Sequence, residues 1–373
     1  MTQPTWHYNG GKIPLQEVIT PIKRGGVSTF ARPIKWVFTV HIGKSALSTS
    51  FANQVKVAVM SARARTTLVP ICITTAHANS EFSQWLVSHR VRVISHTPRW
   101  AERMRDKVAH INRQKKLARE GHFNDSSHLF GDADAMIGTF MRIDIPILGF
   151  RDEFILYTDV DVMFKTDIDW TALLGNTGEA TIRSTNDFAE GKFNFSPAGK
   201  RGLPRYFSGS GETTHTKDPL FMNAGVMLMN MRSLRETYEK FLEFIFADDD
   251  LNWITGPGDQ GAYKYFYSDN IPNELNPAKP HSNFLPYALN WKAYWKYNRE
   301  AAIIHFHGPK CDTDYEPFID RGYVAIKLFE HLLKHGATQG DARRLCREYR
   351  TYLSLENASK WQHIGSRIMN YWS

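Results

Sequence analysis

The chain has 373 residues, of which 42% are hydrophobic and 23% are charged, a composition typical of a globular protein with a substantial core. This length suits two average domains or one large α/β domain with insertions. No apolar run reaches the ~18 residues of a membrane span, and the amino terminus lacks the hydrophobic segment of a secretory signal, so we expect a cytoplasmic protein. Three scattered cysteines exclude a disulfide framework and a zinc site of the CxxC type.

The net charge of +8 is concentrated in two stretches. Residues 99–120 and residues 321–373 each carry +5, which leaves −2 for the rest of the chain. Such stretches are typical of a surface that meets an anionic partner, such as phospholipid, glycolipid phosphate or nucleic acid. A pair of solvated helices explains them equally well, and the sequence leaves both interpretations open.

The first part of the chain predicts a parallel sheet. Residues 1–33 contain paired glycines and no sustained hydrophobic period, which indicates a loose amino-terminal arm. After the arm, strands are expected at residues 35–41, 68–74 and 91–94, and helices at residues 46–62, 80–88 and 100–119. Alternation of strands and helices is the pattern of an α/β domain, which we place at residues 34–320.

The second part of the chain continues this pattern. Strands are expected at residues 155–164, 181–184, 220–230 and 301–306, and helices at residues 322–335 and 341–355 in a basic carboxyl-terminal extension, residues 321–373. A capping box at Ser233 and Glu236 predicts the start of another helix, and Asp259 opens a further one. Residues 188–219 form a long polar loop, the kind that serves as an active-site lid or acceptor-binding segment.

Two aspartates end the apolar run ILYTDVDVMF at residues 155–164. If the strand persists through Val160, Asp159 and Asp161 point to one face, and a hard divalent cation would relieve the repulsion between them. The alternative is a solvated turn or a helix N-cap. The position favours a site, because ligands of open α/β sheets bind at the carboxyl ends of strands.

Five motifs occur in an order that resembles a known family. They are Arg142, YTDVDVMF (157–164), MNAGVMLMN (222–230), GDQGAYK (258–264) and IIHFHGPK (303–310). Together they resemble the retaining glycosyltransferases of family 8, which include bacterial lipopolysaccharide galactosyl- and glucosyltransferases and glycogenin. The resemblance covers residues 36–310 and implies a GT-A fold, a mostly parallel central sheet flanked by helices, with a UDP-sugar donor.

The resemblance also implies a metal site. Its ligands would be Asp159, Asp161 and His305, and the cofactor would be Mn²⁺, or Mg²⁺ in its place. A nitrogen ligand beside carboxylates favours Mn²⁺. His305 as an ordinary core histidine is the alternative.

The remaining motif residues would bind the donor or act in catalysis. By resemblance, Arg142 lies against the donor sugar and phosphate, Asn223 and Asp259 bind sugar hydroxyls, and Gln260 lies beneath the anomeric carbon. Asp159 would also lie near the ribose of the donor. The other donor-binding residues implied are Val40, His41, Ala224, Gly225, Gly308 and Lys310. The alternatives are structural: Arg142 pairs with Asp144 or Asp152, Asn223 ends a strand, and Asp259 caps a helix.

The sequence departs from the family at three places, one of which is the region at residues 188–219, which has no counterpart in the family. Lys310 follows His305 by five residues instead of six, with Cys311 where the family has proline. Val40 and His41 stand where the family has an acidic residue near the uracil.

We therefore expect a cytoplasmic hexosyltransferase that retains the anomeric configuration. Its acceptor would be a glycan or glycolipid of bacterial surface polysaccharide or lipopolysaccharide, with peripheral contact at an anionic inner membrane face and no nucleic acid. One rival is a nucleotidyltransferase, which would need a basic glycine-rich loop after its first strand. The other is a non-catalytic protein that binds nucleic acid or membrane, which would need aromatic residues among the basic ones, where residues 99–120 have only Trp100.

Overall fold

The computed structural model describes residues 7–8, 11–12, 22–24, 27–29, 34–43, 49–119, 133–168, 182–186, 222–247, 259–267, 282–285, 287–293, 301–306, 328–330, 332–333 and 337–354. Three predictions lie outside these residues: the loop at residues 188–219, and the donor-binding roles of Gly308 and Lys310.

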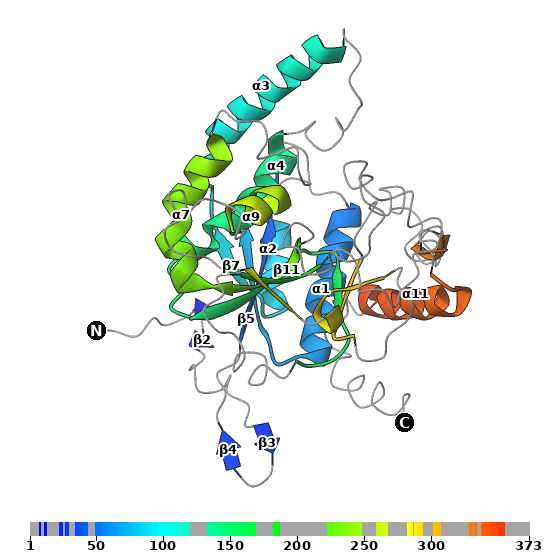
Figure 1. Cartoon of the computed structure of the whole chain (residues 1–373). Helices are drawn as coiled ribbons and strands as arrows, with labels where there is room; N and C mark the ends of the chain where they lie inside the picture. Colours follow the sequence, from blue (N-terminus) through cyan, green and yellow to red (C-terminus); the bar gives the residue numbers. More distant parts are fainter. Residues whose placement is uncertain are drawn as a thin grey trace.

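A seven-stranded sheet forms the centre of the molecule (Figure 1). Its order is β12-β10-β11-β8-β5-β6-β7. The bounds are β5 Lys35–Val40, β6 Val69–Thr74, β7 Arg92–Ser95, β8 Phe154–Thr158, β10 Ile182–Asn186, β11 Met222–Asn230 and β12 Ser282–Phe284. Strands β8, β5, β6 and β7 are parallel, whereas β11 runs antiparallel to both β8 and β10. The predicted mostly parallel α/β sheet is confirmed.

The strand does not persist through Val160, so strand periodicity does not place the two aspartates on one face. Strand β8 ends at Thr158, and β9, Val162–Phe164, belongs to a second sheet of order β13-β14-β9, with β13 at Trp291–Lys292 and β14 at Ile303–His305. The backbone of the intervening DVD segment, Asp159 to Asp161, forms hydrogen bonds with both sheets. The Asp159 amide donates to Gly225 O over 2.8 Å, and the Asp161 carbonyl accepts from Phe306 N over 2.8 Å. The chain therefore changes sheets at the two aspartates.

Helices cover both faces of the large sheet (Figure 1). The bounds are α1 Thr49–Arg65, α2 Glu81–Ser88, α3 Ala101–Arg119, α4 Ala133–Phe140, α7 Met231–Phe246, α9 Asp259–Phe266 and α11 Gln339–Ser354, with 3-10 helices η3 Met141–Ile147 and η6 Tyr287–Leu289. The strands alternate accordingly: Val37 of β5 packs toward α3, α4, η3, α7 and α9, and its neighbours Trp36 and Phe38 pack toward α1 and α2.

The ends of the chain add smaller elements. Two short antiparallel pairs, β1 His7–Tyr8 with β2 Gly11–Lys12 and β3 Ile22–Arg24 with β4 Val27–Thr29, lie in the stretch predicted as an arm. At the other end, α11 packs against α1, with Arg65 Nε donating to Tyr352 Oη over 3.0 Å. In the part of the chain that the structure describes, no helix has the length and apolar character needed to cross a membrane.

The predicted capping box at Ser233 and Glu236 is wrong. Helix α7 begins at Met231, and Asn230 is its N-cap, with a side-chain oxygen that accepts from the amides of Arg232 and Ser233 over 3.2 Å each. Asparagine is among the best N-cap residues, and Asn230 is also the last residue of β11. The chain thus passes from strand to helix with no loop, which places Ser233 inside the first turn.

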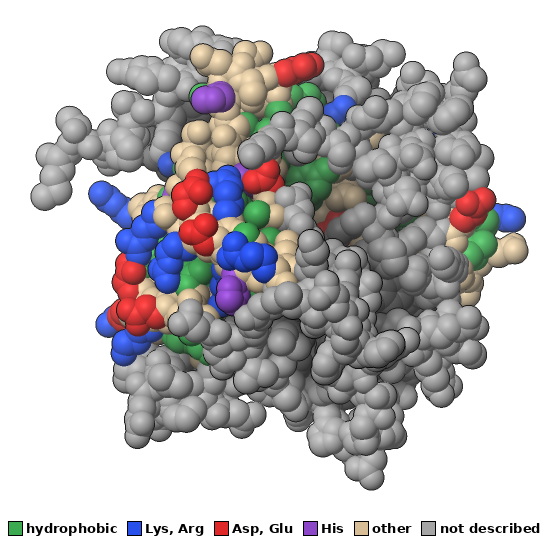
Figure 2. Space-filling view, turned by 90° about the horizontal axis from the view of Figure 1, so that it is seen from above, with side chains coloured by type: hydrophobic (Ala, Val, Ile, Leu, Met, Phe, Trp, Pro, Cys, Tyr) green, Lys and Arg blue, Asp and Glu red, His purple; other side chains and the backbone are tan. Residues whose placement is uncertain are grey.

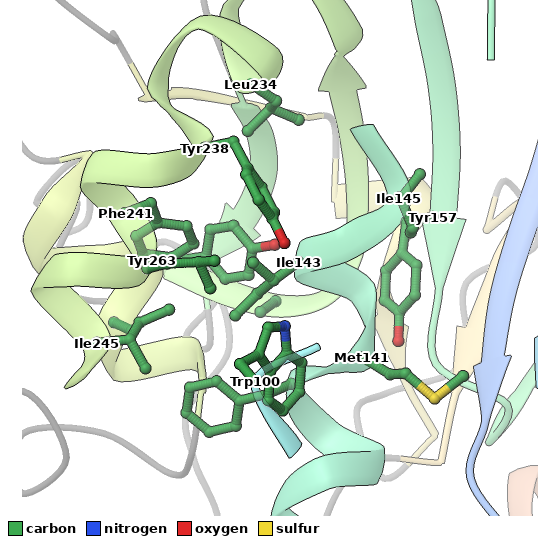
Figure 3. Packing of buried hydrophobic residues seen from close by; sticks show 14 of the residues in the cluster. Trp100, Met141, Ile143, Ile145, Tyr157, Leu234, Tyr238, Phe241, Ile245 and Tyr263 are labelled. Atoms are coloured by element: carbon green, nitrogen blue, oxygen red, sulfur yellow. The ribbon is translucent and has the colours of Figure 1, made fainter. Parts of the chain in front are cut away.

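A fully buried carboxylate joins the helices on one face of the sheet. Asp144 of η3 accepts hydrogen bonds from Trp100 Nε1 (2.8 Å), Tyr238 Oη (2.7 Å) and His96 Nε2 (2.7 Å). Figure 3 shows the polar tips of Trp100 and Tyr238 pointing toward each other among apolar side chains. Three partners from different parts of the chain are therefore tied to η3, the element that also carries Arg142.

We predict that Asp144→Ala lowers the free energy of unfolding by about 3–5 kcal/mol, because it leaves three donors, the buried Trp100 and Tyr238 and the partly exposed His96, without their acceptor. Urea unfolding followed by circular dichroism measures this loss. The matched control is Asp106→Ala on the exposed side of α3, which should change the value by less than about 0.5 kcal/mol. Equal effects of the two substitutions would contradict a structural role for Asp144.

Candidate active site

Three side chains that could hold a metal ion converge where the two sheets meet. Asp159, Asp161 and His305 each offer one ligand atom, and these atoms lie within 4.8 Å of one another. His305 ends β14 and pairs in register with Val162 of β9, so the imidazole lies beside the DVD segment. Its Nε2 is 3.3 Å from Asp161 Oδ1. The ligands that the resemblance implied are thus together, although the bend between β8 and β9 joins them instead of strand periodicity.

The environment of His305 suits a metal ligand. Only 1% of His305 and 3% of Asp161 is exposed. Burial lowers the pKa of His305 from its ordinary value of 6.5; the carboxylate of Asp161 opposes this effect, and the ammonium group of Lys292 adds to it. The imidazole is therefore neutral at pH 7, the state in which its nitrogen can bind a metal. One neutral nitrogen beside two carboxylates is a ligand set that suits a divalent metal ion.

Gly225 leaves the space that the His305 ring occupies. A Cβ atom at this position would lie 2.2 Å from His305 Cε1 and 3.0 Å from His305 Nδ1. The small residues Ala224 and Gly225 let another group approach the β11 backbone closely, and that group is the imidazole. The pairing of β11 with β10 also shifts register here, since Thr185 pairs with Asn223 but Ser184 pairs with Met227.

Arg142 links two of the predicted site carboxylates. Its Nη1 is 3.1 Å from Asp159 Oδ1, and its Nε and Nη2 lie 2.5 Å and 3.0 Å from the two oxygens of Asp259. The same guanidinium donates to Ala224 O over 2.5 Å. The alternative pairing of Arg142 with Asp144 or Asp152 is wrong, because Asp144 bonds to the groups described above and Asp152 pairs with Lys35.

The two partners in this buried pair shift in pKa. Burial acts to lower the pKa of Arg142, but the charges of Asp159 and Asp259 outweigh it and raise the value. Burial raises the pKa of Asp259 to about 7, against the opposing charge of Arg142. Both oxygens of Asp259 contact Arg142, so in this structure the Asp259 side chain positions the guanidinium group.

Asn223 and Gln260 contact each other. Gln260 Oε1 accepts from Ala224 N over 3.1 Å and from Asn223 Nδ2 over 3.3 Å. Both side chains are buried, Asn223 in β11 and Gln260 in the first turn of α9. The structure thus brings together the residues that the resemblance assigned to the sugar, and it directs the amide oxygen of Gln260 toward the β11 backbone.

The residues predicted near the nucleotide base lie at the carboxyl end of β5. Val40 is buried, whereas His41 is partly exposed and bonds through Nδ1 to Thr75 Oγ1 over 3.0 Å. The other ring nitrogen is 3.6 Å from Asp134 Oδ1. His41 therefore links β5 to the loop after β6 and to α4.

Sequence reasoning missed three residues around the metal group. Tyr157 donates to Asp159 Oδ1 over 2.9 Å, and the guanidinium of Arg142 lies 4.7 Å from the centre of its ring. Asn290 and Lys292 flank Trp291 of β13 and lie behind His305, at 2.8 Å and 3.4 Å from its Nδ1. The available signal was a period of two: Asn290 and Lys292 alternate with apolar neighbours ahead of the predicted strand at residues 301–306.

No protein-family model matches the chain, and no curated protein matches it in sequence. Among solved structures, it is similar to the glycosyltransferase GlyE of Streptococcus pneumoniae TIGR4 in its apo form, with 15% identity and a TM-score of 0.45 over 92% of this chain and 63% of that chain. This chain therefore spans less than two thirds of GlyE.

Two further similarities have the same strength. The galactosyltransferase LgtC, in complex with donor and acceptor sugar analogues, has 16% identity and a TM-score of 0.43 over 74% of this chain and 88% of that chain. Mouse xyloside xylosyltransferase 1 has 15% identity and a TM-score of 0.43 over 74% of this chain and 97% of that chain. At these values the similarities carry no argument about activity, which has to come from the site.

We predict that Gly225→Ala weakens Mn²⁺ binding at least about 10-fold, because the added methyl group displaces the His305 ring. Electron paramagnetic resonance of free Mn²⁺ measures the affinity, and circular dichroism checks the fold. The matched control is Gly340→Ala in α11, where a Cβ atom would meet only Thr338 Oγ1 at 3.9 Å. Native Mn²⁺ affinity in Gly225→Ala would contradict the assignment of His305 as a ligand.

Proposed function

We propose that the chain is a metal-dependent glycosyltransferase of the GT-A type that transfers a hexose from a UDP-sugar to a glycan or glycolipid. The observation that carries the proposal is the convergence of Asp159, Asp161 and His305 within 4.8 Å at the ends of three strands. These are the residues that the resemblance to family 8 assigned to the metal, and they come from two motifs more than 140 residues apart.

In this proposal Asp159, Asp161 and His305 hold Mn²⁺, or Mg²⁺ in its place. The bound ion supplies positive charge where the nucleoside diphosphate leaves. The chain itself holds these ligands in position. Asp159 is fixed by Tyr157 and Arg142, and the His305 ring is held against Gly225. A ligand set that is held before the substrate arrives loses little entropy on binding it.

The surroundings of the anomeric carbon support retention without a covalent intermediate. A double displacement needs a carboxylate on the far face of the sugar. The residue assigned there is Gln260, whose amide is a poor nucleophile, and the nearby Asp259 has both oxygens on Arg142. We infer that the acceptor hydroxyl attacks from the side of the leaving group, and that the departing phosphate takes its proton.

The identity of the acceptor and the contact with an anionic membrane stay predictions. The structure reduces the number of basic side chains that could make the membrane contact. Several basic side chains of residues 99–120 have partners within the protein: Arg99 pairs with Glu239, Arg105 with Glu102, and Lys107 donates to Ala247 O. On the face in Figure 2, basic and acidic side chains are interspersed. These three basic side chains therefore already have partners within the protein.

We predict that Asp161→Asn weakens the Mn²⁺-dependent affinity for UDP at least about 10-fold, because the amide that replaces one carboxylate is a poorer ligand. Titration calorimetry with UDP, with and without Mn²⁺, measures the effect. The control is Asp106→Asn, the same change on the exposed side of α3. Unchanged Mn²⁺ dependence in Asp161→Asn would rule out the proposed function.

We predict that a screen of α-linked UDP-hexoses finds a donor that gives an α-linked product, and that Gln260→Ala slows this transfer by about 10²-fold without changing its stereochemistry. Proton NMR coupling constants of the product decide the configuration. Gln84→Ala on the exposed side of α2 is the control. A β-linked product of the unaltered enzyme would overturn the mechanism, and a sugar ester trapped on Asp259 would overturn the role of Gln260.

A further inference from the structure

We propose that Asn290 is a positioning residue that sets the tautomer of His305, as the last member of a hydrogen-bonded chain that starts at the backbone amide of Gly225. The inference rests on the proposed function in one respect, namely that His305 Nε2 binds a metal. The tautomer itself is a property of the protein without any ligand, so it can be tested separately.

The first link fixes the orientation of Asn223. The backbone N–H of Gly225 donates to Asn223 Oδ1 over 3.1 Å, and a backbone amide can only donate. The atom that faces it must therefore be the side-chain oxygen. This leaves Asn223 Nδ2 to face Gln260 Oε1, whose identity is fixed in the same way by the backbone amide of Ala224.

The second link carries this orientation to Asn290. Its Nδ2 lies 2.9 Å from Asn223 Oδ1, which already acts as an acceptor, so the nitrogen of Asn290 must point there. The oxygen of Asn290 then faces the opposite way. It lies 2.8 Å from His305 Nδ1 and 3.4 Å from Lys292 Nζ, which also has to be a donor.

The third link selects the tautomer. An oxygen at 2.8 Å from His305 Nδ1 requires that this nitrogen carries the proton, and Nε2 then presents its lone pair toward the DVD segment. Two contacts favour the opposite tautomer: Lys292 Nζ at 3.4 Å from Nδ1, and Asp161 Oδ1 at 3.3 Å from Nε2. Both distances are longer, and Lys292 can donate to Asn290 Oδ1 instead, which reinforces the Nδ1–H form.

The tautomer of His305 depends on these hydrogen bonds because the residues involved are buried. Asn290 and Lys292 are 0% exposed, and Asn223 and His305 are 1% exposed, so bulk water cannot replace a lost bond. A buried donor or acceptor without a partner is costly, and every member of the chain therefore depends on the next. Partners behind metal-binding histidines commonly change metal affinity by about 10–100-fold when removed.

The test is ¹⁵N NMR of the full chain labelled at histidine, recorded without metal. The signals of His305 are identified by their absence in His305→Ala. We expect a protonated, pyrrole-type Nδ1 and an unprotonated, pyridine-type Nε2. In Asn290→Leu the Nδ1–H form should lose its majority, and Mn²⁺ affinity should fall about 10–100-fold. In Asn290→Asp, which keeps an oxygen toward Nδ1, the tautomer should be retained.

Asn53→Leu is the matched control, because Asn53 is a buried asparagine in α1, outside this hydrogen-bonded chain. A pyrrole-type Nε2 in the unaltered protein overturns the proposal, as does an unchanged tautomer in folded Asn290→Leu. If Asn290→Leu does not fold, the spectra of the unaltered protein and of Asn290→Asp decide. An Nδ1–H tautomer without Mn²⁺ binding supports the role of Asn290 and contradicts the proposed function instead.

Discussion

The pairing of one short segment with two sheets determines the site. At the DVD segment the backbone bonds to β11 through the Asp159 amide and to the end of β14 through the Asp161 carbonyl. A straight strand would leave the two carboxylates near β11 only. The change of sheet instead brings Asp161 to β14, and with it to His305, so a nitrogen ligand joins two oxygen ligands. The metal group is therefore a product of tertiary topology.

The negative charge of the metal group has to be balanced by other residues of the chain. Three carboxylates lie at or near the site: Asp161 and Asp259 are buried, and Asp159 is partly exposed. Burying a carboxylate without compensation is costly. Arg142 neutralises two of them and has no direct contact with Asp161 among the described ion pairs. Asp161, the carboxylate beside His305, is thus the one that Arg142 does not contact among the described ion pairs. A bound cation would be attracted most strongly to this carboxylate. Asp144 holds η3, and hence Arg142, through three donors, of which Trp100 and Tyr238 are buried.

The sequence predicted the architecture well because hydrophobic periodicity is local. Strands β5, β6, β7 and β11 lie within two residues of their predicted bounds. Two predictions failed because interactions that hydrophobic periodicity does not reveal determined the local structure. At Asn230, the last residue of β11, a stronger N-cap prevails over the capping box at Ser233. At Val160 long-range pairing prevails over strand propensity. The partners Asn290 and Lys292 were missed because their role depends on a contact with β14, which lies 11 or more residues away.

The amide network also limits what Asn223 can do. Its oxygen accepts from Gly225 N and Asn290 Nδ2, and its nitrogen donates to Gln260 Oε1. A sugar hydroxyl could engage the oxygen only by competing with these donors, and weakening the bond to Asn290 would free the partner that orients His305. Donor binding and metal binding would then be coupled through one side chain. A buried asparagine with these three bonds to the protein is better suited to connecting Gln260 with the metal group than to binding the sugar.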